Sequence, residues 1–154
     1  MAVSVLLVDW PSQDVPRALL AAGCVVLSAN LAKGTASVYG VVDPGNAPPG
    51  GDGVEVMAAE RDADPALLIR ALDAMPTHVD AIALFRPDAE HVAIVRRAVA
   101  LGARALWVQR GRLADDARPI AGDAGLVVIE DRADGDAIAQ LATVRQQGTH
   151  GSPG

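Results

Sequence analysis

Residues 79–109 read VDAIALFRPDAEHVAIVRRAVALGARALWVQ, and this stretch decides the fold class. Its two ends, 79–85 and 105–109, are short and largely apolar runs, as expected of strands buried in a parallel sheet. Between them, residues 87–101 have the apolar spacing of a helix, which Gly102 would end in a left-handed conformation. A strand, a helix and a second strand in this order predict a right-handed crossover between parallel strands.

The same alternation continues over most of the 154 residues. Further strands are predicted at 3–8, 24–28 and 126–129, and further helices at 15–22, 65–74, 114–124 and 134–146. Two weaker strand candidates, 37–42 and 54–58, flank a loop rich in glycine and proline at 43–53, across which they would pair with each other. The pattern therefore predicts a single α/β domain with a doubly wound, mostly parallel, Rossmann-like sheet. In such a sheet any ligand lies beyond the carboxyl ends of the strands.

Composition and charge exclude several classes of protein. The net charge of −6 argues against general nucleic-acid binding, which needs a basic surface. No apolar run reaches the roughly 18 residues of a membrane span, and the first residues lack the basic region and the small-residue cleavage site of a signal peptide. We therefore expect a cytoplasmic protein. Its richness in alanine and its use of arginine in place of lysine suggest a GC-rich bacterial source.

Common catalytic and cofactor motifs are missing from the sequence. No glycine occurs before Gly23, so the first turn lacks the dinucleotide fingerprint and NAD is not expected. Cys24 is the single cysteine and the histidines lack the spacing of a metal site, so we expect neither a disulfide nor a metal. His78 and His91 are predicted to lie on the surface, and Asp9 to brace a loop or cap a helix rather than act as an acid catalyst. An enzyme is therefore the weakest of the functional hypotheses.

One segment is basic although the chain as a whole is acidic. Residues 86–112 contain six arginines against two acids, a net charge of +4. Arg86 and Arg110 each follow a predicted strand, so both should lie at the edge of the crevice, where guanidinium groups bind phosphate oxygens well. For these two side chains, contact with a ligand and a salt bridge at the surface remain alternatives. Three further arginines are expected on a solvated face: Arg96, Arg97 and Arg104.

Three stretches of the sequence together resemble a known family. They are 81–88 with its Arg-Pro pair, 98–111 with Trp-x-Gln-x-Gly, and 124–132 with Asp-Arg, in this order and at the expected spacing. They resemble the CoA-binding domain family, small Rossmann proteins related to the nucleotide-binding domain of the succinyl-CoA synthetase alpha subunit. The resemblance extends over about residues 3–132. The first turn departs from it, as in a variant branch, because Asp9-Trp10-Pro11-Ser12 stands where members usually have a Gly-Ala-Ser type of turn.

The resemblance implies a crevice that takes CoA or an acyl-CoA, in a chain with no chemistry of its own. It places this small-molecule site in the loops that follow the first, the second and the later strands. The candidate ligand-binding residues are Trp10, Ser12, Asn30, Lys33, Tyr39, Arg86, Pro87, Gln109, Arg110 and Gly111. Trp10 would stack on an adenine, and Lys33 and Arg86 would meet phosphates.

The chain is expected to divide accordingly. Residues 1–133 would form the CoA-binding-like domain, 134–147 a C-terminal helix packed on it, and 148–154 a disordered tail.

A second hypothesis keeps the fold without the ligand: a structural or regulatory module that binds a partner protein or forms a homodimer. The glycine-free first turn motivates it, and Trp10 would then fill the former pocket. An open crevice lined by Trp10, Arg86 and Gln109 would count against it.

Overall fold

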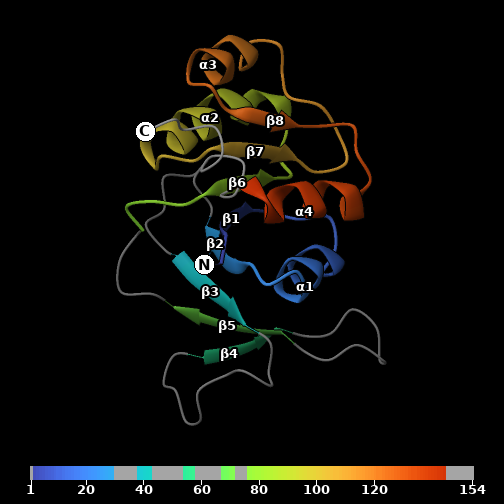
Figure 1. Cartoon of the computed structure of the whole chain (residues 1–154). Helices are drawn as coiled ribbons and strands as arrows, with labels where there is room; N and C mark the ends of the chain where they lie inside the picture. Colours follow the sequence, from blue (N-terminus) through green and yellow to red (C-terminus); the bar gives the residue numbers. More distant parts are fainter. Residues whose placement is uncertain (1, 30–37, 43–53, 58–66, 72–75, 145–154) are drawn as a thin grey trace, which may run out of the picture.

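The computed structural model describes residues 2–29, 38–42, 54–57, 67–71 and 76–144. Within these residues, eight strands form one sheet, with helices on both faces of its larger part (Figure 1). Strands distant in the sequence lie side by side at the centre of the sheet. The chain therefore adds strands on one side of its first strand, returns to the centre, and then adds the remaining strands on the other side.

Five strands form a parallel half. They are β1 (Ser4–Val8), β2 (Val25–Ala29), β6 (Ala81–Leu84), β7 (Ala105–Val108) and β8 (Val127–Ile129). β1 lies between β2 and β6, and β7 and β8 follow outward from β6. Nearly every residue of β1, β6 and β7 is buried, which explains the continuous apolar runs in their sequences. The predicted doubly wound, mostly parallel sheet is confirmed.

The other half of the sheet is antiparallel. β3 (Val38–Val42) pairs with β2 on one side and with β5 (Leu67–Ala71) on the other, and β4 (Val54–Met57) pairs with β5. The full order is β4-β5-β3-β2-β1-β6-β7-β8. From β3 onward this is the Rossmann order, except that β3 runs antiparallel to β2.

Two predictions for this half are wrong. Residues 67–71, expected within a helix at 65–74, form β5, and β4 pairs with β5 rather than with β3. A short apolar run fits one face of a helix and a buried strand equally well, so spacing does not decide between them. The deciding interaction is long-range, because β5 lies between β3 and β4, where its backbone groups bond on both sides.

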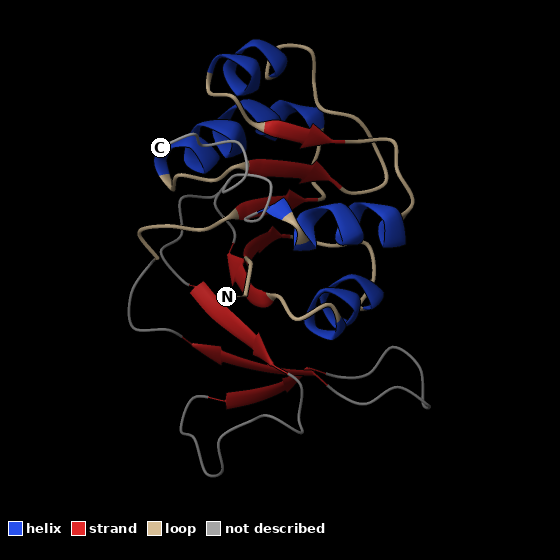
Figure 2. Cartoon of the chain, viewed as in Figure 1, coloured by secondary structure: helices blue, strands red, loops and turns tan. Residues whose placement is uncertain are grey.

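Helices cover both faces of the parallel half (Figure 2). One face holds α1 (Asp14–Ala21) and α4 (Asp134–Ala142), and the other holds the short 3-10 helix η2 (Asp88–Glu90), α2 (His91–Ala100) and α3 (Arg118–Asp123). The alternation of side chains along β1 divides the core between them. Val5 and Leu7 belong to the cluster under α1 and α4, and Leu6 and Val8 to the cluster under α2 and α3.

Two glycines end helical segments where the sequence predicts it. Gly23 (φ 86°) follows α1 and Gly102 (φ 69°) follows α2, both in the left-handed conformation. α4 occupies the first part of the predicted C-terminal helix, while the division at residues 133 and 134 stays a prediction. The predicted loop at 43–53 and tail at 148–154 lie outside the described residues. No helix in the described part of the chain is long and apolar enough to cross a membrane.

Candidate ligand-binding site

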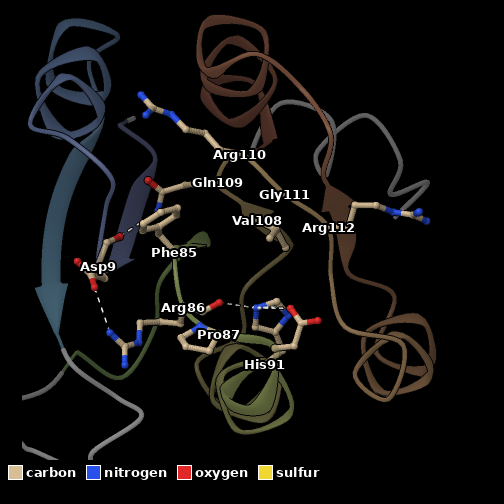
Figure 3. Close-up of a pocket in the computed structure, with 11 residues that line it drawn as sticks. Asp9, Phe85, Arg86, Pro87, His91, Val108, Gln109, Arg110, Gly111 and Arg112 are labelled. Atoms are coloured by element: carbon tan, nitrogen blue, oxygen red, sulfur yellow. Dashed lines mark hydrogen bonds and ion pairs between the residues drawn. The ribbon is translucent and has the colours of Figure 1, made fainter.

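A cavity of about 460 Å³ opens at the carboxyl ends of the parallel strands (Figure 3). It lies where the direction of strand addition changes, since the chain passes from β1 to β2 on one side and from β6 to β7 on the other. Three segments form its wall: the end of β1, the connection from β6 to α2, and the loop after β7. Its lining residues are Asp9, Phe85, Arg86, Pro87, Asp88, His91, Val108, Gln109, Arg110, Gly111 and Arg112.

The register of the sheet places three lining residues in a row. The last residues of β1, β6 and β7 are register partners in neighbouring strands, and all are buried. The residues that follow them are Asp9, Phe85 and Gln109. Backbone hydrogen bonds extend the ladders this far, from the Phe85 N–H to the Val8 carbonyl (3.0 Å) and from the Gln109 N–H to the Leu84 carbonyl (2.9 Å). The site therefore begins where the buried runs end.

Three loop residues at this edge have a left-handed backbone although none is glycine. They are Asp9 (φ 69°), Arg110 (φ 54°) and Asp131 (φ 54°), which follow the ends of β1, β7 and β8. Aspartate tolerates this conformation better than most residues, whereas it is uncommon for arginine. Each turn redirects the chain just after a strand and leaves a charged side chain at the edge of the sheet.

Asp9 connects the loop after β1 to the loop after β6. Its Oδ1 accepts the N–H of Trp10 (2.9 Å), and its Oδ2 accepts a guanidinium N–H of Arg86 (3.1 Å). The Nε of Arg86 donates to Glu90 (2.7 Å). Hydrogen bonds to Glu90 and Asp9 raise the pKa of Arg86, so its guanidinium stays charged. Asp9 therefore braces a loop, as predicted, and the charge of Arg86 is held between two carboxylates.

Gln109 fixes the β7 end of the same wall. It is 2% exposed, and its Nε2 donates to the backbone carbonyl of Asp9 (3.0 Å). Its Oε1 is buried and has no hydrogen-bond partner among the described residues. The side chain of Gln109 thus ties the end of β7 to the end of β1, across the intervening β6.

His91 lies beside the cavity, and the prediction that it is a surface residue is wrong. It is 1% exposed. Its Nδ1 accepts the backbone N–H of Ala114 (3.0 Å), so the ring proton is on Nε2, which donates to the carbonyl of Arg86 (2.9 Å). The first turn of a helix looks accessible in the sequence pattern, but here the loops after β6 and β7 cover it.

Two further guanidinium groups belong to the loop after β7. Arg110 donates to the Oδ2 of Asp134 at the start of α4 (3.3 and 3.1 Å), and the Nε of Arg112 lies 3.3 Å from Asp131. The Arg110 and Arg112 side chains are 48% and 67% exposed. Ion pairs this exposed are weak, so a phosphate would compete effectively for both guanidinium groups.

Glu130 supports this loop from the end of β8. It accepts two hydrogen bonds from Arg118 of α3 (2.8 and 2.7 Å) and one from the N–H of Leu113 (2.8 Å). The hydrogen bonds from Arg118, and then that from Leu113, lower the pKa of Glu130. An ionised carboxylate therefore holds the loop against α3.

The cavity brings together half of the sequence-predicted site residues: Arg86, Pro87, Gln109, Arg110 and Gly111. The two predicted residues of the first turn, Trp10 and Ser12, lie elsewhere. Trp10 packs, partly buried, against the cluster under α1 and α4, so it neither lines nor fills the cavity. The Oγ of Ser12 accepts a backbone N–H at the start of α1 (3.2 Å). Asn30 and Lys33 fall outside the described residues, as does the side chain of Tyr39.

Several lining residues were not predicted to bind a ligand: Asp9, Phe85, Asp88, His91, Val108 and Arg112. A signal existed for Phe85, which directly follows a predicted strand, as Asp9 does. Phe85 is 41% exposed, and with Val108 it gives the cavity an apolar wall beside its arginines.

No group of His, Cys, Asp and Glu side chains in the described part of the chain is placed to hold a metal ion. The cavity is therefore suited to binding an anion with an apolar portion.

Comparison with protein families identifies the chain. The sequence model of the CoA binding domain matches residues 52–135, which is more than half of the chain. The match includes β6, β7 and β8 and the two loops after β6 and β7 that line the cavity, and it begins after the first turn. The chain therefore belongs to the CoA binding domain family.

Proposed function

We propose that the chain is a non-catalytic binding protein whose cavity takes CoA, an acyl-CoA or another adenine nucleotide. The cavity is the observation that supports this most, because it combines three arginines with an apolar wall at the switch point of a Rossmann-like sheet. Membership of the CoA binding domain family supports the same class of ligand. A volume of about 460 Å³ lies within the usual range of small-molecule sites.

Each part of such a ligand has a matching surface. Arg110 and Arg112 are exposed enough to take phosphate oxygens in a bidentate manner. The exposed ring of Phe85 gives an apolar face for an adenine or for the pantetheine chain. Arg86 is less available, because two carboxylates already hold its guanidinium. We therefore assign the main phosphate contacts to the loop after β7.

A second candidate is a ligand-free structural or regulatory module that binds a partner protein or a second copy of the chain. One observation favours it: the Asp9 carboxylate occupies the first turn, where it would repel a diphosphate, and it already neutralises Arg86. In this case the arginines that line the cavity only form ion pairs with carboxylates of the same chain. Under either candidate, the cytoplasmic location and the bacterial source remain predictions.

A thermal-shift screen followed by calorimetry separates the two candidates. The ligands are CoA, acetyl-CoA, adenosine 3′,5′-bisphosphate, pantetheine and ATP. A ligand at about one hundred times its Kd should stabilise the fold by about 2.7 kcal/mol. No shift with any of them at millimolar concentration would contradict the binding proposal, and a dimer or a stable complex in gel filtration would then favour the module.

Arg112→Gln and Arg104→Gln form a matched pair for this screen. Both remove one charge from an exposed arginine next to β7, but Arg112 lines the cavity whereas Arg104 precedes the strand at its opposite end. Arg112→Gln should weaken the phosphate-bearing ligands and leave pantetheine unchanged, and Arg104→Gln should change neither. Equal losses in both variants would indicate general charge attraction. Hydrolysis of acetyl-CoA by the pure chain would contradict a non-catalytic role.

A further inference from the structure

His91 joins the two loops that form most of the cavity wall. One ring nitrogen bonds to the loop after β6 and the other to the loop after β7, at 2.9 and 3.0 Å. The residue is 1% exposed, so water does not compete for either bond. A single side chain therefore spans the distance between the two loops.

The partners of the ring decide where its proton lies. A backbone N–H only donates, so Nδ1 accepts from Ala114 and carries no proton. A backbone carbonyl only accepts, so Nε2 carries the proton that is donated to Arg86. The carboxylate of Asp88 lies 3.9 Å from Nε2, beyond hydrogen-bonding distance. The ring with its proton on Nε2 thus satisfies both loops at once.

Both bonds end on segments whose arginines are among the residues that line the cavity. The carbonyl of Arg86 is bonded to His91, and the same residue lines the cavity. Ala114 belongs to the same loop as Arg110 and Arg112 and follows Arg112 by two residues. A buried imidazole needs a partner for each ring nitrogen, and here the two partners belong to the two loops of the cavity wall. Loss of the ring would remove this direct connection between the two loops.

We propose that His91 is a positioning residue: its imidazole sets the separation of the loops after β6 and β7, and so arranges the arginines that meet a phosphate-bearing ligand. The effect on binding rests on the proposed function. The connection between the loops does not depend on any ligand, so it is testable in the free protein.

Three substitutions separate the two bonds. Asparagine places an oxygen near the position of Nδ1, so His91→Asn keeps the acceptor for Ala114. Glutamine places an amide nitrogen near the position of Nε2, so His91→Gln keeps the donor for Arg86. His91→Leu keeps neither. Val95→Ala is the control, because this fully buried residue of α2 lies outside the cavity and its truncation lowers stability without removing either bond.

Amide hydrogen exchange tests the connection without a ligand. The Ala114 amide should exchange roughly tenfold faster or more in His91→Leu and His91→Gln, relative to the Val95→Ala control, and stay protected in His91→Asn. In the wild-type protein, nitrogen chemical shifts should place the ring proton on Nε2. Unchanged protection of the Ala114 amide in His91→Leu, or a ring proton on Nδ1, would overturn the proposal.

Calorimetry with CoA tests the effect on binding. The Kd of His91→Leu should rise roughly tenfold, with His91→Asn and His91→Gln between it and the wild type. Val95→Ala should leave the Kd within about twofold at a similar loss of stability. A wild-type Kd in His91→Leu, or an equal rise in Val95→Ala, would overturn the positioning role. If the wild-type protein binds no CoA at millimolar concentration, the proposed function fails and the exchange experiment alone decides on His91.

Discussion

Replacing Asp9 with asparagine should tighten the binding of phosphate-bearing ligands while leaving the fold nearly as stable. Asparagine tolerates the left-handed conformation of this residue (φ 69°), and its side-chain oxygen still accepts the N–H of Trp10. The ion pair that is lost joins side chains of Asp9 and Arg86 that are 51% and 26% exposed. Such pairs contribute at most about 1 kcal/mol, so the free energy of unfolding should fall by no more than that.

The gain in affinity follows from Coulomb's law. Besides the main contacts in the loop after β7, a second phosphate of the ligand would reach the Arg86 guanidinium, roughly 6 Å from the Asp9 carboxylate. Two unit charges at this separation repel by about 0.7 kcal/mol in water and about 2.8 kcal/mol at an effective dielectric constant of about 20. Removing this repulsion should lower the Kd about 3- to 100-fold. The gain should shrink as salt is added, because exposed charges are screened.

Calorimetry with adenosine 3′,5′-bisphosphate at low and high salt measures this effect. Asp116→Asn is the matched control, since it removes the same charge from an exposed residue outside the cavity. It should change the Kd far less than Asp9→Asn. An Asp9→Asn variant that binds no more tightly than the wild type would refute the electrostatic reasoning, and one that binds more weakly would show that the carboxylate itself contacts the ligand.

Three further predictions concern the framework of the site. Because Arg118 and Leu113 hold the pKa of Glu130 below its ordinary value of 4.5, the stabilisation is present above that value and is lost as the pH falls through the lower pKa of the folded state. Urea midpoints should therefore fall less steeply below pH 4.5 in Glu130→Gln than in the wild type, and equal slopes would contradict this. Trp107→Phe should change the free energy of unfolding by less than about 1 kcal/mol, because the lost packing offsets the removal of a buried N–H without a partner in the described part of the chain. A loss above about 3 kcal/mol in urea would contradict this offset. Burial raises the pKa of the Cys24 thiol, so a thiol reagent should label the native chain far more slowly than the urea-unfolded chain, and equal rates would contradict its burial.

The parallel half of the sheet was predictable because its signals are local. In residues 79–109 the apolar runs, the helical spacing and Gly102 each specify their own element, and the structure has two strands and a helix there. The strand ends then located Arg86 and Arg110, because the carboxyl ends of parallel strands share one edge of the sheet. The position of the cavity was therefore predictable. Its complete lining was not, because it also depends on how the loops fold over the strand ends.

The missing information is long-range. Residues 67–71 form a strand because β3 and β4 offer backbone partners on both sides. The sequence of the segment itself does not favour a strand over a helix. The burial of His91 depends on two loops that cover it. The direction of Trp10 depends on the packing of α1 and α4 over the sheet, which takes the indole away from the cavity. In each case the outcome is decided by segments distant in the sequence.

The left-handed turns at Asp9, Arg110 and Asp131 concentrate backbone strain at the edge of the sheet where the cavity opens. Glycine adopts the same φ freely, whereas a side chain there costs of order 1 kcal/mol or more. Asp9 thus follows a path that a glycine-containing turn would take, and adds a carboxylate to it. Each of these residues combines a strained backbone with a charged side chain that pairs with another segment, so glycine at these positions would relieve the strain and abolish the pairing in one step.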